Sequence, residues 1–404
     1  MKQMKICVVL LALLLAAIVM VPIVSATDDF RSLSNDKDLI ESNYIPIDTA
    51  REQAAITMVS MIKSGALDEN WVGASVNKEP VIIYDINGKM LFYQFFVEKD
   101  GKKTGQILSP ASKVLGTMVK QIGDPATLDF YDVQKKAEQI VTTKYSGFTI
   151  QSTKIVAYSY PKMGVMILLS NLKSQEQKSI IIDAVDFSEI PEKMPLADGE
   201  PGAWSYYGQI PEKIRLENIV HWDTQNKAGE SDERIMGTKA LGEANYIQYF
   251  PTTDQEQTEW CAIATAWLIT KFHYPTTSRT QTNVANNMNV YSNTGPAWDE
   301  EIQYYLDSYA SGGLGKSNSY TDYWSGSPQD VTYDMIKTEI NANRPLKISH
   351  SGHARTCIGY WQYTSGEKLY KFSDTWPSSP KTYWENPPNP YSSITGYMSY
   401  IITQ

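Results

Sequence analysis

One pattern, an amphipathic helix followed by strand-like runs, occurs twice between residues 45 and 188. The first helix begins at Pro46 and the second at Tyr131. The strand-like runs are Val81–Tyr84, Met90–Val97 and Gly105–Leu108 after the first helix, and 148–158, 162–169 and 179–186 after the second. Asn87-Gly88 and Asp100-Gly101 separate the first three runs and are typical of hairpin turns. The pattern predicts two helix-plus-meander units, either an internal repeat or one α+β domain with accidental symmetry.

The first 26 residues have the composition of a targeting segment. Lys2 and Lys5 precede an apolar run over 6–24, and small residues fit signal-peptidase cleavage after Ala26. The sequence therefore predicts a signal peptide over 1–26 and a mature chain that is secreted, either extracellular or at the cell surface. The apolar run is also long enough to span a bilayer, so an uncleaved anchor stays open, and membrane contact is expected only in that case.

Composition narrows the function classes. The chain has 404 residues, of which 42% are hydrophobic and 20% charged, an ordinary globular composition with room for two domains. The formal net charge is −9 and no basic stripe offsets it, which argues against a nucleic-acid partner. Three Cys and four His leave few ways to build a zinc site and exclude a disulfide framework, and no cofactor is implied.

Residues 190–243 differ in texture from the regions on either side. Pro and Gly are frequent at first, and a charged stretch, Lys227–Arg234, follows. We interpret 190–243 as a linker between an N-terminal α+β prodomain or accessory domain, residues 27–189, and a C-terminal domain, residues 244–404. A long ordered loop packed across both domains is the alternative. The C-terminal domain contains seven of the ten Trp and both Cys that follow the signal segment, so chemistry is expected there.

Cys261 is the candidate nucleophile. Apolar residues recur at helical spacing from Cys261 to Phe272, and Thr258 is placed to cap this helix, which puts the thiol in the first turn. The N–H groups and the dipole at a helix start lower the pKa of a thiol, and the thiolate is the nucleophilic form. From position alone, a small buried residue of a core helix is an equally open interpretation.

His353 is the candidate base, and Asp374 is the candidate residue that orients it. The segment from Pro345 to Trp361 is typical of two strands broken at Ser351-Gly352, with His353 directly after the break. A turn then returns the chain as a further strand that ends at Asp374, with Trp376 nearby. A hairpin of this kind brings His353 and Asp374 to the same end, where a carboxylate can hold the imidazole.

The other His and Cys are less well placed for catalysis. His273 lies twelve residues along the same helix from Cys261, and His221 falls in the expected linker. His350 is interpreted as a partly exposed structural residue. Cys357 is interpreted as a buried structural thiol, with a Cys261–Cys357 disulfide as the alternative.

A side-chain amide before the helix is the candidate oxyanion donor. Gln255 lies six residues before Cys261, and its amide together with the Cys261 N–H would form an oxyanion hole. Gln257 is the competing residue for this role.

Residues 244–404 resemble the papain-like cysteine peptidases, and especially compact branches such as the staphopains and the bacteriocin-leader-peptidase-like domains. The motifs that carry the resemblance are, in order, Gln255, Trp260-Cys261-Ala262, Gly352-His353-Ala354, Gly359-Tyr360 and Asp374-Thr375-Trp376. The resemblance implies a central helix packed on an antiparallel barrel, a Cys-His-Asp triad of Cys261, His353 and Asp374, and an oxyanion role for Gln255. Two departures are an Asp where papains carry Asn, and a shorter interval between Cys261 and His353. The N-terminal region is similar to peptidase propeptide domains.

The sequence therefore predicts a secreted thiol protease that hydrolyses peptides or proteins through a thioester acyl-enzyme. Its N-terminal domain is expected to act as an intramolecular inhibitor, which makes the chain a zymogen. Two alternatives stay open: a catalytically dead papain-like scaffold that serves as a cell-surface binding protein, and a transpeptidase or amidohydrolase that uses the same site.

Overall fold

The computed structural model describes residues 37–125, 128–171, 173–193, 201–232, 243–323, 333–350, 352–362, 367–386 and 398–403. The chain divides into two units, Met1–Ser42 and Asn43–Gln404. Helix α2 (Lys37–Ser42) is the described part of the first unit, and the expected signal segment 1–26 lies outside the described residues. None of the described helices is long and apolar enough to cross a membrane.

The first helix-plus-meander region, hereafter the first meander, has the predicted elements. Helix α3 (Ile47–Lys63) precedes strands β1 (Ser75–Val76), β2 (Val81–Asp85), β3 (Met90–Lys99), β4 (Lys102–Pro110) and β5 (Gln121–Gly123), with the short helices η2 (Glu69–Trp71) and η3 (Lys113–Leu115) between them. Strands β2, β3 and β4 are antiparallel neighbours. The turns that connect them contain Gly88, Asp100 and Gly101 at positive φ, so the hairpin signals in the sequence are confirmed.

The second helix-plus-meander region, hereafter the second meander, has the same order of elements. Helix α4 (Phe130–Lys144) precedes the antiparallel strands β6 (Thr149–Ser159), β7 (Lys162–Ser170) and β8 (Gln177–Asp183). Asp129 caps α4, because its side chain accepts the N–H groups of Tyr131 and Asp132. Strand β6 pairs with β2 in parallel, which joins the two meanders. That the meanders are copies of one repeat stays a prediction.

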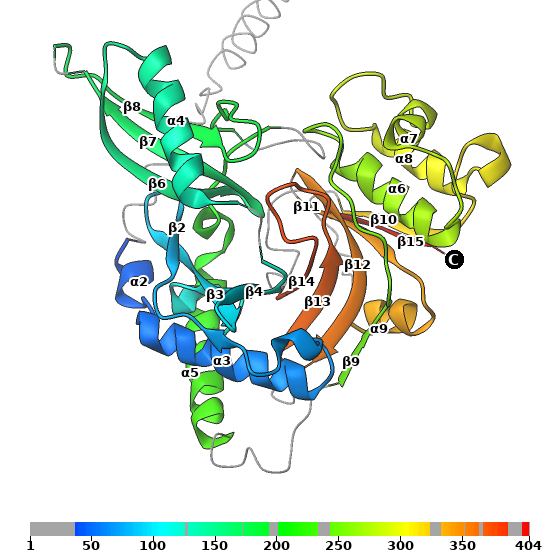
Figure 1. Ribbon diagram of the computed structural model, residues 1–404, viewed down its shortest axis with the longest axis horizontal. Coiled ribbons are helices and arrows are strands. Elements are labelled where there is room, and N and C mark those ends of the chain that lie inside the picture. The colour runs from blue at the N-terminus through cyan, green and yellow to red at the C-terminus, as the bar shows by residue number, and fades with distance from the viewer. Residues whose placement is uncertain are drawn as a thin grey trace, which may run out of the picture. The chain divides into compact units, whose positions relative to one another are not determined.

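The C-terminal region is built around helix α6 (Cys261–His273), which packs against β12 and beside α7 (Figure 1). Its other helices are α7 (Gln281–Asn287), α8 (Trp298–Leu306), η5 (Tyr309–Ser311) and α9 (Tyr333–Asn341). Its strands are β9 (Glu243–Tyr246), β10 (Ser317–Tyr323), β11 (Leu346–His350), β12 (His353–Gln362), β13 (Lys368–Ser373), β14 (Thr382–Glu385) and β15 (Met398–Thr403). Buried residues of α6, including Ile263, Leu268 and Ile269, form one apolar core with Leu346 and Ile348 of β11.

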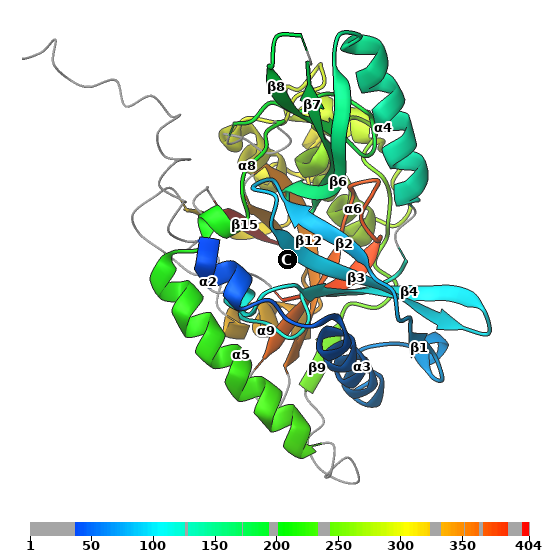
Figure 2. The ribbon, with the colours of Figure 1, turned by 90° about the vertical axis from the view of Figure 1, so that its left-hand side faces the viewer.

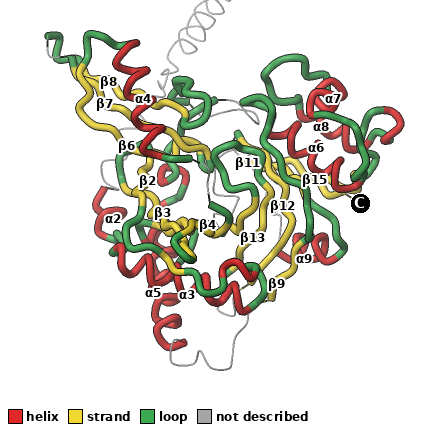
Figure 3. The backbone as a smooth tube through the Cα atoms, in the orientation of Figure 1, coloured by secondary structure: helices red, strands yellow, loops and turns green. Residues whose placement is uncertain are grey.

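A single sheet runs through both regions, and the fold is α+β as predicted (Figures 1, 2 and 3). The described strands form a 15-stranded sheet in the order β10-β15-β11-β12-β13-β14-β5-β4-β3-β2-β6-β7-β8, with β1 beside β3 and β9 beside β12. The two regions meet where β14 pairs with β5, with Tyr383 opposite Gly123. A Cβ atom at Gly123 would lie 2.5 Å from the Tyr383 Cβ, so only glycine allows this close approach.

The first meander and the C-terminal region also share an apolar core. Trp361 and Trp384 of the C-terminal strands lie in the same buried cluster as Phe95 and Ile107 of β3 and β4. The Trp361 indole donates a hydrogen bond to Ser64 Oγ at 2.9 Å, and the Trp384 indole donates to the Ala66 carbonyl at 3.1 Å. The first meander is therefore packed into the C-terminal region rather than only tethered to it.

Part of the expected linker is ordered structure. The short helix η4 (Tyr207–Gln209) and the long helix α5 (Glu212–Asp232) lie within 190–243, as Figure 2 shows for α5. Buried Arg215 donates to the carbonyls of Ile210 and Tyr207, and the Asn218 amide donates to the Val114 carbonyl. Residues 201–232 are thus ordered and pack on the first meander, and much of this range is helix, whereas the stated alternative was a long loop across both domains. Residues 233–242 lie outside the described residues, and the domain boundaries stay predictions.

The burial of Asp85 predicts a pH dependence of stability. Asp85 accepts hydrogen bonds from Ser205 Oγ at 2.5 Å and from the Tyr206 N–H at 2.9 Å. Burial outweighs these bonds and raises the pKa of Asp85 from 3.8 to about 6. The folded chain therefore holds this proton more tightly than the unfolded chain does. As the pH rises from about 4 to about 6, this group lowers the free energy of unfolding by about 3 kcal/mol.

The variant Asp85→Asn should lose this part of the pH dependence. An amide keeps an acceptor for Tyr206 and cannot ionise, so its free energy of unfolding should exceed that of the wild type increasingly as the pH approaches 7. Urea denaturation of both proteins at several pH values between 4 and 7 measures the difference. A constant difference across this range would contradict the prediction.

Candidate active site

Cys261 is the first residue of α6 and is fully buried. In the first turn of a helix the N–H groups have no acceptor four residues earlier, and they form the positive end of the helix dipole. The expected cap was wrong: Trp260 occupies the N-cap position and makes no side-chain cap hydrogen bond. Thr258 instead donates its hydroxyl to Asp186 Oδ2 at 3.2 Å, because the loop after β8 reaches this position.

His353 is the first residue of β12 and directly follows a tight turn. Strands β11 and β12 form an antiparallel hairpin in which His350 pairs with His353. Gly352 has a φ of +81°, which a glycine adopts without strain, so the break predicted at this position is confirmed. The next residue, Ala354, packs in a buried cluster with Cys261 and Ala262, and its carbonyl accepts the hydroxyl of Thr265 at 3.3 Å. The start of β12 therefore lies against the first turn of α6.

Asp374 lies within hydrogen-bonding distance of the imidazole. Its Oδ1 is 2.9 Å from His353 Nε2 and accepts the Trp376 N–H at 2.8 Å, and its Oδ2 accepts the Tyr383 hydroxyl at 2.7 Å. Burial alone would raise the pKa of Asp374, but His353, Arg355 and the Tyr383 hydroxyl outweigh it and lower the pKa to about 2. Asp374 is therefore an ionised carboxylate that accepts the Nε2–H of His353, which makes Nδ1 the ring nitrogen available for proton exchange with a thiol.

Trp376 flanks the imidazole as the sequence predicted. Its ring stands edge-on to His353, with ring centroids 6.2 Å apart and an interplanar angle of 81°. Both side chains are fully or almost fully buried, so the His353–Asp374 hydrogen bond is shielded from water.

Gln255 is buried beside the same loop, whereas Gln257 is exposed. The backbone N–H of Gln255 donates to the Thr375 carbonyl at 2.8 Å, which ties the loop before α6 to the residue after Asp374. The Gln255 amide donates to the carbonyls of Gln257 at 2.9 Å and Thr258 at 2.6 Å. Both hydrogens of the Gln255 amide are thus donated to carbonyls of its own loop. Gln255 lies in the loop before Cys261, as expected for an oxyanion donor, but its amide is bonded within that loop.

Cys357 and His273 lie apart from this arrangement. Cys357 is buried on β12, where burial raises its pKa to about 12, and no disulfide joins Cys261 and Cys357. His273 lies at the other end of α6, where burial, followed by the charge of Lys316, lowers its pKa to about 4. The side chain of His350 lies outside the described residues. Among the described residues, no cluster of three His, Cys, Asp or Glu side chains could hold a metal ion.

Four polar residues near Asp374 were missed at the sequence level: Tyr383, Arg355, Glu385 and Lys120. Tyr383 hydrogen-bonds to Asp374, and Arg355 donates to both Tyr383 and Glu385. The available signal was a pair of charged residues, Arg355 and Glu385, each of them the one Lys, Arg, Asp or Glu of its strand.

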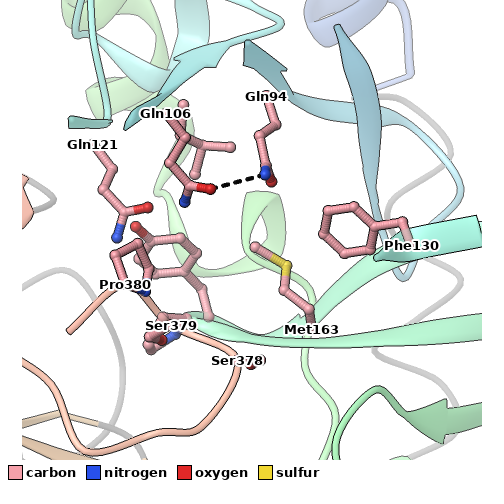
Figure 4. A pocket seen from close by; sticks show the side chains of 11 residues that line it. Gln94, Gln106, Gln121, Phe130, Met163, Ser378, Ser379 and Pro380 are labelled. Carbon is pink, nitrogen blue, oxygen red and sulfur yellow. Dashed lines mark hydrogen bonds between the residues drawn. The ribbon is translucent and has the colours of Figure 1, made fainter. Parts of the chain in front are cut away.

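A small pocket lies between the first meander and the loop that follows Asp374 (Figure 4). Gln94, Gln106 and Gln121 line one side of it, and Gln94 donates to Gln106 at 3.0 Å. Ser379 of the loop and Met163 of the second meander line the other side. The lining contains none of the predicted site residues, so this pocket is separate from the candidate active site.

The C-terminal region thus has a papain-like arrangement, with a thiol at the start of the central helix and a His–Asp pair on the facing strands. Residues 247–399 match the model of the Peptidase_C39 like family, a papain-like cysteine peptidase family, which confirms the resemblance inferred for the C-terminal region. The sequence matches none of the curated proteins. The family match does not include residues 27–189, so their similarity to propeptide domains stays a prediction.

The geometry predicts that an amide can replace the Asp374 carboxylate. In Asp374→Asn, Oδ1 can still accept from His353 and Trp376, and the new N–H group can donate to the Tyr383 hydroxyl. This variant should keep peptidase activity within about 10-fold, whereas Asp374→Ala should lose at least about 100-fold in kcat/KM because all three hydrogen bonds are absent. Steady-state kinetics on a fluorogenic peptide measures both. Equal kcat/KM for the wild type and Asp374→Ala would remove this residue from the site.

Proposed function

We propose that this chain is a secreted cysteine peptidase, made in a latent form, with Cys261, His353 and Asp374 as its catalytic triad. The observation that carries the proposal is the His353–Asp374 hydrogen bond of 2.9 Å at the start of a strand whose next residue packs on Cys261. A thiol at a helix start, an imidazole on the facing strand and a carboxylate behind it are the groups that thiol-based acyl transfer requires.

In the proposed mechanism His353 Nδ1 takes the proton of the Cys261 thiol. The thiolate then attacks the peptide carbonyl carbon, and the negative charge moves to the carbonyl oxygen. The imidazolium gives its proton to the leaving amine as the C–N bond breaks, which leaves a thioester. Water attacks this thioester, His353 accepts the water proton, and the acid product leaves as the thiol is restored.

The oxyanion role proposed for Gln255 requires one rearrangement. Its amide hydrogens are donated to the carbonyls of Gln257 and Thr258, so one of these bonds must be exchanged for a bond to the substrate oxygen. The backbone N–H of Cys261 is the second proposed donor. Gln255 is preferred over Gln257 because it is buried and its backbone is bonded to Thr375.

Latency is supported by the burial of the catalytic groups. Cys261, His353 and Asp374 each have an exposed fraction of 0%. A peptide carbonyl must come into contact with the sulfur before it can react, so a fully buried thiol is closed to substrate. The intact chain is therefore proposed to need an opening step.

Two contacts of the second meander support its proposed role as the intramolecular inhibitor. The Lys162 ammonium lies 4.7 Å from the centroid of the Trp376 ring, which flanks His353. The Asp186 carboxylate accepts the hydroxyl of Thr258, three residues before Cys261. The loop that contains Trp376 is thus in contact with Lys162 of β7, and the loop before Cys261 is in contact with Asp186, which follows β8.

Export is proposed on sequence grounds alone. The segment 1–26 has the charge and hydropathy of a signal peptide, and an exported thiol protease is safest when it is closed until it leaves the cell. The peptide or protein substrate is proposed from the reaction class.

Cys261 is the proposed nucleophile, so its replacement should stop the reaction. Cys261→Ala should abolish peptidase activity and labelling by an irreversible thiol inhibitor, while the unfolding temperature stays near that of the wild type because the cavity left by one sulfur atom is small. Cys357→Ala is the matched control, since this thiol is equally buried but lies apart from His353. Residual cleavage by Cys261→Ala at the wild-type rate would make the mechanism wrong, and aminolysis products in place of hydrolysis would indicate a transferase.

The Lys162 and Asp186 contacts are proposed to keep the site closed, so their removal should open it. The double variant Lys162→Ala/Asp186→Ala removes both contacts described above. It should raise the rate of Cys261 labelling and the kcat/KM about 10-fold or more, since two polar contacts contribute about 1.4 kcal/mol or more to closure. Labelling followed by peptide mapping measures the rate at Cys261.

The matched control is Lys154→Ala. Lys154 belongs to the same meander and lies 4.5 Å from the Tyr84 ring centroid, a contact of the same kind within the N-terminal region. Its loss should leave the labelling rate unchanged. An intact wild-type chain that is as active and as quickly labelled as the double variant would rule out latency and leave the catalytic assignment standing.

A further inference from the structure

We infer that Lys120 of the N-terminal region is a positioning residue for the catalytic His353, acting through a buried hydrogen-bond chain that passes through Glu385, Arg355, Tyr383 and Asp374. This inference rests on the proposed function, because it assigns a role in catalysis. It departs from the simple propeptide model, in which the whole N-terminal region is removable.

The hydrogen-bond chain begins with a buried ion pair between Lys120 and Glu385. Lys120 precedes β5 and is 2% exposed, and Glu385 on β14 is 0% exposed. The Lys120 ammonium lies 3.0 Å from Glu385 Oε1 and donates to the Asn386 carbonyl at 2.6 Å. The backbone fixes this contact, because Gln121, the next residue, pairs with Glu385 across the β5–β14 junction.

From Glu385 the hydrogen-bond chain continues through Arg355 and on to the imidazole of His353, and each member is bonded to the next. Arg355 lies on β12 and donates through Nη1 to Glu385 Oε2 and to the Tyr383 hydroxyl, the latter at 2.8 Å. The Tyr383 hydroxyl donates to Asp374 Oδ2 at 2.7 Å, and Asp374 Oδ1 lies 2.9 Å from His353 Nε2. Each of these side chains is at most 1% exposed.

The chemistry of the side chains fixes the direction of every bond in this chain. Ammonium and guanidinium groups only donate, and ionised carboxylates only accept. The Tyr383 oxygen must therefore accept from Arg355, and its single hydrogen is directed to Asp374. Asp374 in turn accepts from His353 Nε2–H, which leaves Nδ1 for the thiol proton. The cations thus determine the tautomer of the catalytic imidazole.

Lys120 is needed because the charges balance only when it is present. Two cations, Lys120 and Arg355, lie with two carboxylates, Glu385 and Asp374, in a volume closed to water. Burial raises the pKa of Glu385, and the charges of Arg355 and Lys120 outweigh burial and lower it below its ordinary value. Without Lys120, the two buried carboxylates would share the one remaining cation, Arg355. The Glu385 side chain, which accepts from Arg355, would then lose the contact that fixes its position.

The packing of the two meanders indicates that the first meander stays with the C-terminal region when the site opens. Trp361 and Trp384 bond to Ser64 and Ala66, so the first meander stays with the C-terminal region through apolar packing, sheet pairing and an ion pair. Val156 and Ile181 of the second meander lie in another buried cluster, against which Tyr84 and Ile86 of the first meander pack, and β6 pairs with β2. Opening of the site is therefore expected to move the second meander about the β2–β6 pairing, while the β5–β14 junction keeps Lys120 in place.

The test is a double-mutant cycle in the full chain, carried in the opened Lys162→Ala/Asp186→Ala background, with kcat given per site titrated by an irreversible thiol inhibitor. Lys120→Met and Tyr383→Phe should each lower kcat about 10-fold or more, since Lys120→Met removes the bonds to Glu385 and the Asn386 carbonyl, and Tyr383→Phe removes those to Arg355 and Asp374. KM should stay unchanged because neither side chain contacts the cleaved peptide. The double variant should be no slower than Tyr383→Phe alone, because Lys120 acts through Tyr383.

A matched control is available in Lys347→Met. Lys347 is a buried lysine 3.0 Å from the buried Glu301, in the same region but on β11, and this ion pair is not part of the hydrogen-bond chain from Lys120 to His353. Its kcat per titrated site should equal that of the parent. If Lys120→Met does not fold, the isosteric Glu385→Gln should give the same loss of kcat.

Two results would overturn the inference alone: an unchanged kcat per titrated site in both Lys120→Met and Glu385→Gln, or effects of Lys120→Met and Tyr383→Phe that multiply as independent changes do. A parent protein that is neither labelled at Cys261 nor able to hydrolyse any peptide would overturn the proposed function together with this inference. A loss of kcat that Lys347→Met reproduces would show a general effect of breaking buried ion pairs, and would also count against it.

Discussion

A carboxylate with no exposed surface, that of Asp374, places the strictest demand on this structure. An ionised carboxyl group in a dry interior is tolerated only when donors surround it. Here the donors come from three places: the imidazole of His353 at the start of β12, the N–H of Trp376 in the following loop, and the hydroxyl of Tyr383 on β14. The three elements must take up one register relative to one another, so the strand pairing and the catalytic geometry are specified together.

Most of the local structure could be predicted because its signals lie within a few residues of one another. Helical spacing located α6, and the positive-φ glycine at 352 marked the turn before His353. The hairpin argument then brought His353 and Asp374 together, because antiparallel strands of similar length return the chain to its starting end. These inferences need no knowledge of the rest of the chain, which is why they hold.

The contacts that were missed join segments far apart in the sequence. Thr258 has the right residue type and spacing for a cap, but the Asp186 carboxylate of the N-terminal region is its partner instead. Lys120 and Glu385 are separated by 265 residues, and no periodicity or turn signal relates them. Helix α5 lies in a range whose Pro and Gly content indicated a linker, and packing of Arg215 and Asn218 decides its place. In each case tertiary context overrides a valid local preference.

The two meanders contact the C-terminal region through different kinds of interaction. This difference bears on how one sheet can both join the two regions and let the site close. Apolar burial and sheet pairing are lost only when a large surface separates at once, so the junction of β5 with β14 persists through local opening. A lysine over an aromatic ring and a hydroxyl bonded to a carboxylate are single contacts that can separate one at a time. Lys162 and Asp186 make contacts of this second kind with the C-terminal region, whereas Trp384 and Gly123 belong to the first kind. The segment proposed to close the site must leave it without unfolding the strands that carry His353 and Asp374. The second meander can do so by pivoting about the β2–β6 pairing, because that pairing joins it to the first meander and not to those strands.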